Sequence, residues 1–166
     1  SDTGKVNSIL NRPEIRNTMQ RKDVRFLWSA KPIEGSKNIF DLIAIKIPRD
    51  GNPRLTGDHV TNATVEYGQL NNKPEVSMTM DGPGANTWRR MTKENIKKSI
   101  AIVLDGYVYS FPTVQSEIAG GRSSISGNFS PEEAKDLANI LNSGKMDAPA
   151  RIVQEAIVGP SLGKEA

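Results

Sequence analysis

The feature that most constrains the fold of this chain is the stretch SIAIVLDGYVYSFPTV at positions 99–114. Its first half is a nearly continuous apolar run, which is typical of a strand that is covered on both faces. The dipeptide Asp105-Gly106 follows this run and predicts a two-residue β-hairpin turn into a second strand. Pro112 cannot donate to a sheet ladder, so the second strand either ends there or lies at an edge. The stretch therefore predicts a hairpin whose first strand is central in a sheet.

The segment SPEEAKDLANILNSGK at 130–145 predicts the clearest helix of the chain. Ser130 is the expected N-cap, Pro131 occupies the first helical position, and Glu133 completes a capping box. Gly144 fits the left-handed residue that ends many helices. One apolar stripe at helical spacing is expected to face the core, formed by Ala134, Leu137, Ala138 and Leu141.

The remaining pattern predicts an α+β protein. Further strands are expected at 23–30, 39–48, 75–80, 122–127 and 150–158, with a short helix at 85–95 and partly helical structure in 1–22. The first two strands form a hairpin with an eight-residue loop at 31–38. From 75 onwards the order of strands and helices is that of the ferredoxin-like (split βαβ) arrangement, with two helices on one face of an antiparallel sheet. The Gly- and Pro-rich segment 49–57 separates this unit from the first hairpin.

Composition excludes several classes of site. The chain has 166 residues, long enough to bury a core, and it contains no cysteine, which removes disulfides, thiolate zinc sites and cysteine nucleophiles. No apolar run approaches the roughly 20 residues that a membrane-spanning helix needs. The single histidine, His59, follows Asp58, and neighbours on a strand cannot form a catalytic dyad. Glycine-rich 120–127 lacks the ending of a phosphate-binding loop. We expect no enzyme activity, no metal and no cofactor.

A cluster of basic residues leaves an alternative function open. Five cations lie close together near the start of the chain: Arg12, Arg16, Arg21, Lys22 and Arg25. Such a run usually forms a solvated helix face, but it also fits contact with nucleic acid or with an anionic membrane surface. A ferredoxin-like nucleic-acid-binding module is therefore the alternative hypothesis, and a small-molecule enzyme or receptor domain with a concave pocket is a third.

Several ordered motifs resemble the SecD family of bacterial protein-export membrane proteins, in the later part of its first extracytoplasmic domain. The resemblance covers residues 55–163 and begins with LTGDHVTNA at 55–63. Its other marks are the Ala-Ile-Val-Leu-Asp-Gly run, Pro112–Val114, Ile118–Gly121, Ile125–Phe129, Glu133-Ala134, Leu137-Ala138, Ser143-Gly144 and Val-Gly-Pro-Ser-Leu-Gly at 158–163. Residues 1–54 match the family only weakly.

The resemblance implies a division of the chain and a location. A ferredoxin-like base (55–158) is expected near the membrane, with a small α+β head subdomain in 1–54. Residues 159–166 are expected to begin the linker to a transmembrane helix, with Gly159, Pro160, Ser161 and Gly163 at the membrane junction, because Gly and Pro end a strand and turn the chain. The implied location is the inner membrane, on its periplasmic side.

The same resemblance implies a mechanical role in late, proton-gradient-driven protein export. The expected partners are an unfolded preprotein, the Sec translocon and a SecF-like protein, and no nucleic acid. Four apolar residues on the first two strands are the candidates for preprotein contact, namely Phe26, Trp28, Phe40 and Leu42, although aromatic residues on strands are more often core. Three linker residues are the candidates for a hinge between head and base: Gly51, Pro53 and Gly57.

Overall fold

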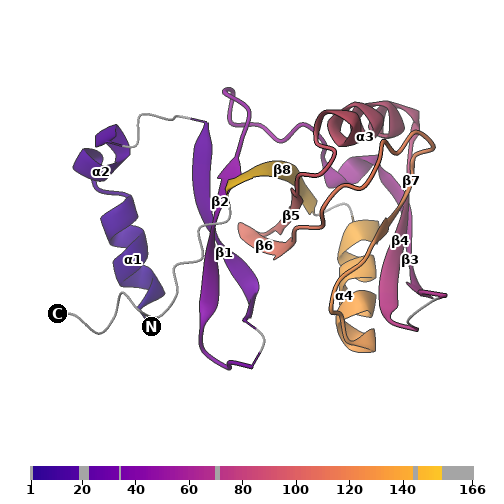
Figure 1. The fold of residues 1–166 in the computed structure, drawn as a ribbon, viewed down its shortest axis with the longest axis horizontal. Coiled ribbons are helices and arrows are strands. Elements are labelled where there is room, and N and C mark those ends of the chain that lie inside the picture. The colour runs from indigo at the N-terminus through magenta and orange to yellow at the C-terminus, as the bar shows by residue number, and fades with distance from the viewer. Residues whose placement is uncertain (1, 19–22, 34, 70–71, 144–145, 155–166) are drawn as a thin grey trace.

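The computed structural model describes residues 2–18, 23–33, 35–69, 72–143 and 146–154. In these residues the chain is a mixed α+β protein with mainly antiparallel strand pairing in two sheets (Figure 1). The expected α+β class is therefore confirmed. The last twelve positions, which include the predicted membrane junction at Gly159, Pro160, Ser161 and Gly163, lie outside the described residues, as does Gly144.

The first sheet is a closed barrel with the strand order β1-β2-β8-β5-β6. Its members are β1 (Val24–Pro32), β2 (Phe40–Lys46), β5 (Ile100–Leu104), β6 (Tyr107–Ser110) and β8 (Met146–Gln154). The barrel is closed by one parallel bridge between β1 and β6, at Ser29 and Val108, and every other pair is antiparallel. Both predicted hairpins, β1–β2 and β5–β6, are present in this barrel.

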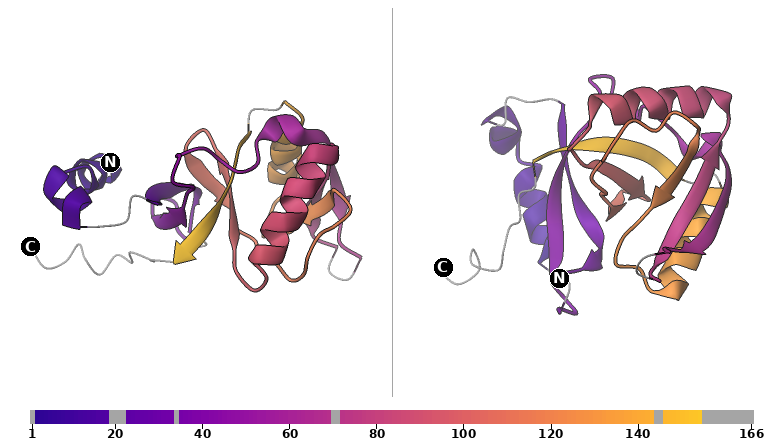
Figure 2. Two further views of the ribbon diagram at one scale, coloured as in Figure 1. Left: turned by 90° about the horizontal axis from the view of Figure 1, so that it is seen from above. Right: turned by 45° about the vertical axis from the view of Figure 1, so that its right-hand side comes forward.

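The second sheet has three antiparallel strands in the order β3-β4-β7. These are β3 (Val60–Tyr67), β4 (Pro74–Met80) and β7 (Arg122–Ile125). Helix α4 (Pro131–Asn142) packs against β3 and β4, and α3 (Gly82–Glu94) connects the end of β4 to β5. Figure 2 shows both helices on the same half of the molecule as this sheet.

Strand β5 is buried on both faces and joins two hydrophobic cores. Its even residues, Ile100, Ile102 and Leu104, belong to the larger core with α3, α4 and the three-stranded sheet. Its odd residues, Ala101 and Val103, belong to the barrel core with β2 and β6. This arrangement explains the apolar run at 100–104, because every position of the strand needs an apolar side chain.

The prediction of one ferredoxin-like sheet is corrected by this topology. The strand predicted at 75–80 pairs with the one predicted at 122–127 on one side and with β3 on the other. The strands predicted at 99–106 and 150–158 pair with each other in the barrel, where the second of them also pairs with β2 of the first hairpin. A strand whose two faces are both apolar can support a layer on each side, so β5 carries the larger core on one face and the barrel core on the other, while it pairs with β8 and β6 within the barrel. Strand β3, which was not predicted, supplies the third strand of the smaller sheet.

The turn, the helix cap and the strand end that were predicted from neighbouring residues are all present, although the predicted order of strands in one sheet is not. Asp105 and Gly106 both have positive φ, at 49° and 81°, as a type I′ hairpin turn requires. Ser130 Oγ accepts from the backbone N–H of Glu133, and the Glu133 carboxylate accepts from Ser130 N, so the capping box is present. Strand β6 ends at Ser110, before Pro112.

Two short helices precede the barrel. They are α1 (Thr3–Leu10) and α2 (Pro13–Thr18), and none of the side chains described in α1 is buried. Figure 1 shows both helices beside β1, on the side away from the larger core. They confirm the partly helical start predicted for 1–22.

None of the helices in the described part of the chain is long and apolar enough to cross a bilayer.

Candidate functional site

The four apolar residues predicted to contact preprotein lie on one face of the β1–β2 hairpin. Trp28 is the direct cross-strand partner of Leu42, and Phe26 is the partner of Ala44. Phe40 lies two residues before Leu42 on β2 and so faces the same side, because side chains alternate along a strand. We call this surface, formed by Phe26, Trp28, Phe40, Leu42 and Ala44, the outer face of the hairpin.

The opposite side of the same hairpin points into the barrel. Ile43 and Ile45 are buried in the barrel core, and Leu27 packs against that core. The alternation of the two strands therefore gives a hairpin that is apolar on both sides, with only one side used by the barrel. The barrel core therefore does not explain why the outer face is apolar.

The residues of the outer face differ in how much surface they offer. Leu42 is only 6% exposed and Ala44 7%, whereas Phe26, Trp28 and Phe40 are half-buried. The indole N–H of Trp28 donates to Asn7 Oδ1 of α1 at 2.8 Å, which fixes its ring next to that helix. In this conformation the aromatic side chains are the accessible part of the face, and Leu42 supports them from the sheet.

The predicted hinge residues lie in the linker between β2 and β3. Gly51 has a φ of 76° and donates its N–H to Pro48 O at 2.9 Å, so it closes a turn that a side chain would strain. Gly57 is buried and begins a short 3-10 helix, Gly57–His59. Pro53 is half-buried. The structure thus shows a turn at 48–51 and an anchored segment at 57–59 at the two ends of the linker.

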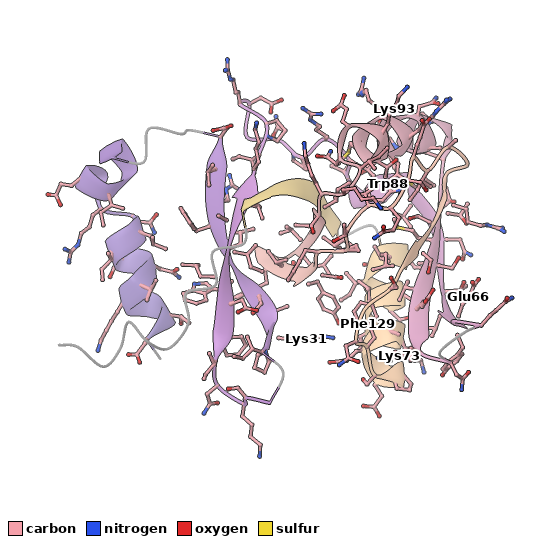
Figure 3. The ribbon with its side chains drawn as sticks, viewed as in Figure 1. Lys31, Glu66, Lys73, Trp88, Lys93 and Phe129 are labelled. Carbon is pink, nitrogen blue, oxygen red and sulfur yellow. The ribbon has the colours of Figure 1, made fainter. Side chains whose placement is uncertain are left out.

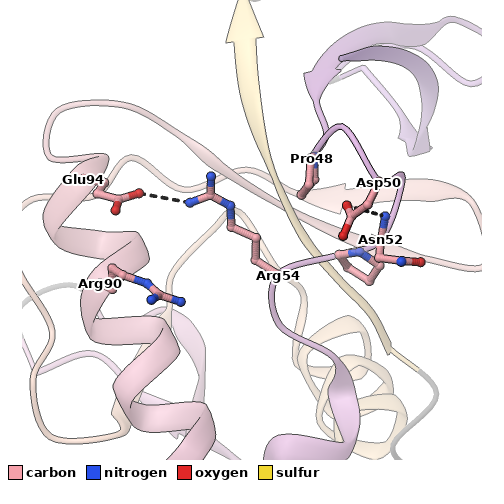
Figure 4. Close-up of a pocket in the computed structure, with 7 residues that line it drawn as sticks. Pro48, Asp50, Asn52, Arg54, Arg90 and Glu94 are labelled. Atoms are coloured by element: carbon pink, nitrogen blue, oxygen red, sulfur yellow. Dashed lines mark hydrogen bonds and ion pairs between the residues drawn. The ribbon is translucent and has the colours of Figure 1, made fainter. Parts of the chain in front are cut away.

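A shallow pocket separates this linker from α3 (Figure 4). Arg54 reaches across it and pairs with Glu94 of α3 at 3.0 Å, with Arg90 beside them. Both partners of this ion pair are about half-exposed, so it contributes little to stability. The polar lining and the open shape do not resemble the enclosed apolar cavity of a small-molecule site. The lining residues are Pro48, Asp50, Asn52, Pro53, Arg54, Arg90 and Glu94.

His59 forms a hydrogen bond that sequence reasoning missed. Its Nδ1 lies 3.0 Å and 3.1 Å from the two carboxylate oxygens of Asp81. Asp81 is also the N-cap of α3 and accepts from Gly84 N at 2.7 Å. This backbone hydrogen bond, together with the hydrogen bond to His59, holds the pKa of Asp81 below its ordinary value. The arrangement fixes the start of α3 against the start of β3.

Lys31 links the first hairpin to the larger core. Its Nζ pairs with Glu133 at 2.9 Å and lies 4.9 Å from the ring centre of Phe129 and 5.2 Å from that of Tyr109. Figure 3 shows Lys31 and Phe129 next to each other, between β1 and α4. Burial alone would raise the pKa of Glu133, but hydrogen bonds from Ser130 N and Lys31 outweigh it and lower that pKa. The charge at the N-terminus of α4 therefore holds the end of β1.

No group of three or more His, Cys, Asp or Glu side chains in the described residues could hold a metal ion. Of the basic cluster near the start of the chain, the structure describes the side chains of Arg12 and Arg25, and both are exposed. Arg16 has no described side chain, and Arg21 and Lys22 lie outside the described residues.

Comparison with known sequences points to a single family. A family model described as the SecDF P1 head subdomain matches residues 43–148. The protein translocase subunit SecD of Rhodothermus marinus is 42% identical over 166 residues, which covers 98% of this chain and 26% of that protein. SecDF of Thermus thermophilus is 39% identical over 120 residues, which covers 72% of this chain and 16% of that protein. The chain thus spans about a quarter of the length of the R. marinus relative.

Solved structures agree with the sequence comparison. A SecDF described as a membrane component that enhances protein export superposes with a TM-score of 0.51 at 38% identity, covering 66% of this chain and 50% of that one. A Thermus SecDF described as a translocon-associated membrane protein has the same TM-score and identity and covers 75% of this chain and 17% of that one.

The family match also bears on the division of the chain. The head-subdomain model matches residues 43–148, which begin within the predicted head (1–54) and continue into the predicted base (55–158). The larger core, built from α3, α4 and the three-stranded sheet, lies within the matched residues. The chain belongs to the SecDF family of protein translocase subunits, and its match to that family is the P1 head subdomain.

Proposed function

We propose that this chain is the non-catalytic, periplasmic part of a Sec translocase accessory subunit, and that it holds an unfolded preprotein during late export. The observation that carries the proposal is the sequence identity of 42% to a SecD, in an alignment that covers 98% of this chain. It is supported by the similar SecDF structure that is described as enhancing protein export. Its partners are the preprotein, the Sec translocon and a SecF-like protein. It acts at the inner membrane, where the rest of the subunit uses the proton gradient.

Within the chain, we assign preprotein contact to the outer face of the hairpin. Unfolded chains differ in sequence, so a surface that holds them needs apolar contacts without a strict shape requirement. Phe26, Trp28 and Phe40 offer such contacts, and the barrel does not use them for its core. Leu42 supports them from the same face.

We further propose that the head is the larger core within the matched residues 43–148 and that the barrel belongs to the base. The linker with Gly51, Pro53 and Gly57 then joins β2 of the barrel to β3 of the head, and head movement relative to the base uses these residues as its hinge. The positive φ of Gly51 supports a hinge at that end of the linker. The movement limits backward sliding of the preprotein.

The assignment is tested by measuring export in membrane vesicles that contain the full-length subunit and an imposed proton gradient. We expect Trp28→Ser to slow the late stage of translocation, because it removes the largest aromatic contact of the outer face. Ile96→Ser is the matched control, since Ile96 is 42% exposed in the turn after α3, outside the β1–β2 hairpin. Equal export rates for both variants and the wild type would contradict the assignment.

A further inference from the structure

Among the described residues, strand β3 lies at an edge of the three-stranded sheet, because the strand order is β3-β4-β7. Gly68 N donates to Lys73 O at 2.9 Å, which shows that the backbone groups of Gly68 face β4. In an antiparallel pair these directions alternate from one residue to the next. The backbone groups of Ala63, Val65 and Tyr67 therefore face away from β4.

A side chain of α4 already uses the first of these outward positions. Asn142 Oδ1 accepts from Ala63 N at 2.7 Å, and Asn142 Nδ2 donates to Ala63 O at 2.8 Å. A primary carboxamide in this position makes the same two hydrogen bonds as a residue of an added strand. The outward edge of β3 therefore has the geometry to accept an amide partner, and this one is supplied by the chain itself.

The next two outward positions have no such partner within the described residues. No hydrogen bond beyond the β3–β4 ladder involves the backbone of Val65 or Tyr67 there. Tyr67 is 54% exposed, and Val65 is half-buried against the larger core. Natural proteins usually protect such an edge with a bulge, a proline or a covering element. The bulge of β3 is at its other end, between Val60 and Asn62.

We propose that the edge of β3 at Val65–Tyr67 binds an extended segment of the exported polypeptide as an added β-strand. The inference rests on the proposed function, which supplies an unfolded chain as the partner. The polypeptide backbone is common to all exported sequences. An added strand is bound through hydrogen bonds between its backbone N–H and C=O groups and those of the edge strand, whatever its side chains are. The Asn142 carboxamide marks where the added strand ends, because Ala63 is already satisfied.

The test uses the full-length subunit in lipid nanodiscs and a fluorescent, reduced and carboxymethylated lactalbumin, which is a permanently unfolded polypeptide. Tyr67→Pro removes the outward N–H, and β3 tolerates it because that N–H does not bond to β4. We expect its affinity for the probe to fall about fivefold, the equivalent of one net hydrogen bond. Tyr67→Ala removes the aromatic ring, keeps the N–H and should bind like the wild type.

A second measurement does not depend on a variant. Hydrogen–deuterium exchange of the wild-type subunit should show slower exchange at Val65 and Tyr67 when the probe is bound. Equal losses of affinity in Tyr67→Pro and Tyr67→Ala, or no change in exchange, would overturn the added strand while the proposed function stood. Slower exchange on raising the subunit concentration without probe would assign the edge to a second copy. A wild type that does not bind the probe would remove the proposed function and this inference with it.

Discussion

His59, Asp81 and Gly84 show how single residues fix the entry to α3. The His59–Asp81 pair joins the start of β3 to the N-cap of α3, and Gly84 allows the close approach between them. A Cβ on Gly84 would lie 2.7 Å from His59 Cβ and 2.9 Å from Asp81 Oδ1. The sequence could not reveal this partner, because Asp81 is distant from His59 in the chain and only the fold brings the two together.

Gly84→Ala should therefore destabilise the protein by about 1–3 kcal/mol, since the backbone of the 3-10 helix Gly57–His59 fixes the position of His59 Cβ, which cannot rotate away. Gly82→Ala is the control, because a Cβ at Gly82 meets nothing within 4 Å in the same helical turn. Urea denaturation gives the free energy of unfolding of both variants. A Gly84→Ala variant as stable as Gly82→Ala would show that the approach of His59 is not tight.

The lowered pKa of Asp81 gives the stability a pH dependence. A carboxylate whose pKa is lower in the folded state than in the unfolded state stabilises the fold above its ordinary value, here 3.8, and this contribution is lost as the pH falls through the lower folded value. Asp81→Asn keeps an N-cap but does not titrate. Its stability should fall less than that of the wild type as the pH drops below 3.8, in a series of denaturation curves. Parallel pH profiles would contradict this account of Asp81.

At the scale of elements, the sequence predicts correctly those features that depend on residues close together in the chain, such as a turn or a helix cap. The Asp105-Gly106 turn and the capping box of α4 depend only on neighbouring residues, and both are present. Strand β3 was missed because the bulge between Val60 and Asn62 shifts its period, so that its buried residues Val60 and Ala63 are three apart. A search for strict alternation does not find such a strand.

The outer face of the hairpin could be predicted only in part, because alternation along one strand is a local signal whereas the pairing of two strands is not. Alternation along each strand placed Phe26 with Trp28 and Phe40 with Leu42. That these two pairs share one face depends on the register between β1 and β2, which includes an irregularity between Trp28 and Pro32. Which face the barrel would use also depends on β5 and β8, and a local pattern contains no such information.

The capping box of α4 allows an element-scale prediction. Ser130→Ala removes the acceptor for Glu133 N and should lower the free energy of unfolding by about 1 kcal/mol. Ser116→Ala, in an exposed loop position, should have no measurable effect. Thermal denaturation followed by circular dichroism compares the two variants. A loss in both variants, or in neither, would mean that the cap does not limit the stability of α4.

At the scale of the whole molecule, the two cores are coupled to each other. Strand β5 supplies side chains to both, and Lys31 holds the end of β1 against Phe129 and Glu133. A rotation at the linker that moves the hairpin relative to α4 must separate Lys31 from Glu133. The contacts of Lys31 therefore oppose the proposed movement of the head.

Lys31→Met tests this restraint, because it keeps the apolar stem and removes the charge. The ion pair is partly exposed, so its loss together with the cation–π contacts should lower the free energy of unfolding by about 1 kcal/mol. Hydrogen exchange in the β1–β2 hairpin should become faster. Lys37→Met, exposed in the loop of the same hairpin, is the control. An effect of the same size in Lys37→Met would exclude a specific restraint by Lys31.

The central claim, that the outer face of the hairpin holds exported polypeptide, is tested most directly by site-specific photocrosslinking during export. A photoreactive amino acid is placed at Trp28 in the full-length subunit, and at Ile96 in the exposed turn after α3 as the control, while a preprotein is stalled in the translocon. The account predicts that Trp28 crosslinks to the stalled preprotein and that Ile96 does not. Crosslinks from Trp28 to lipid alone, or equal crosslinks to the preprotein from both positions, would contradict it.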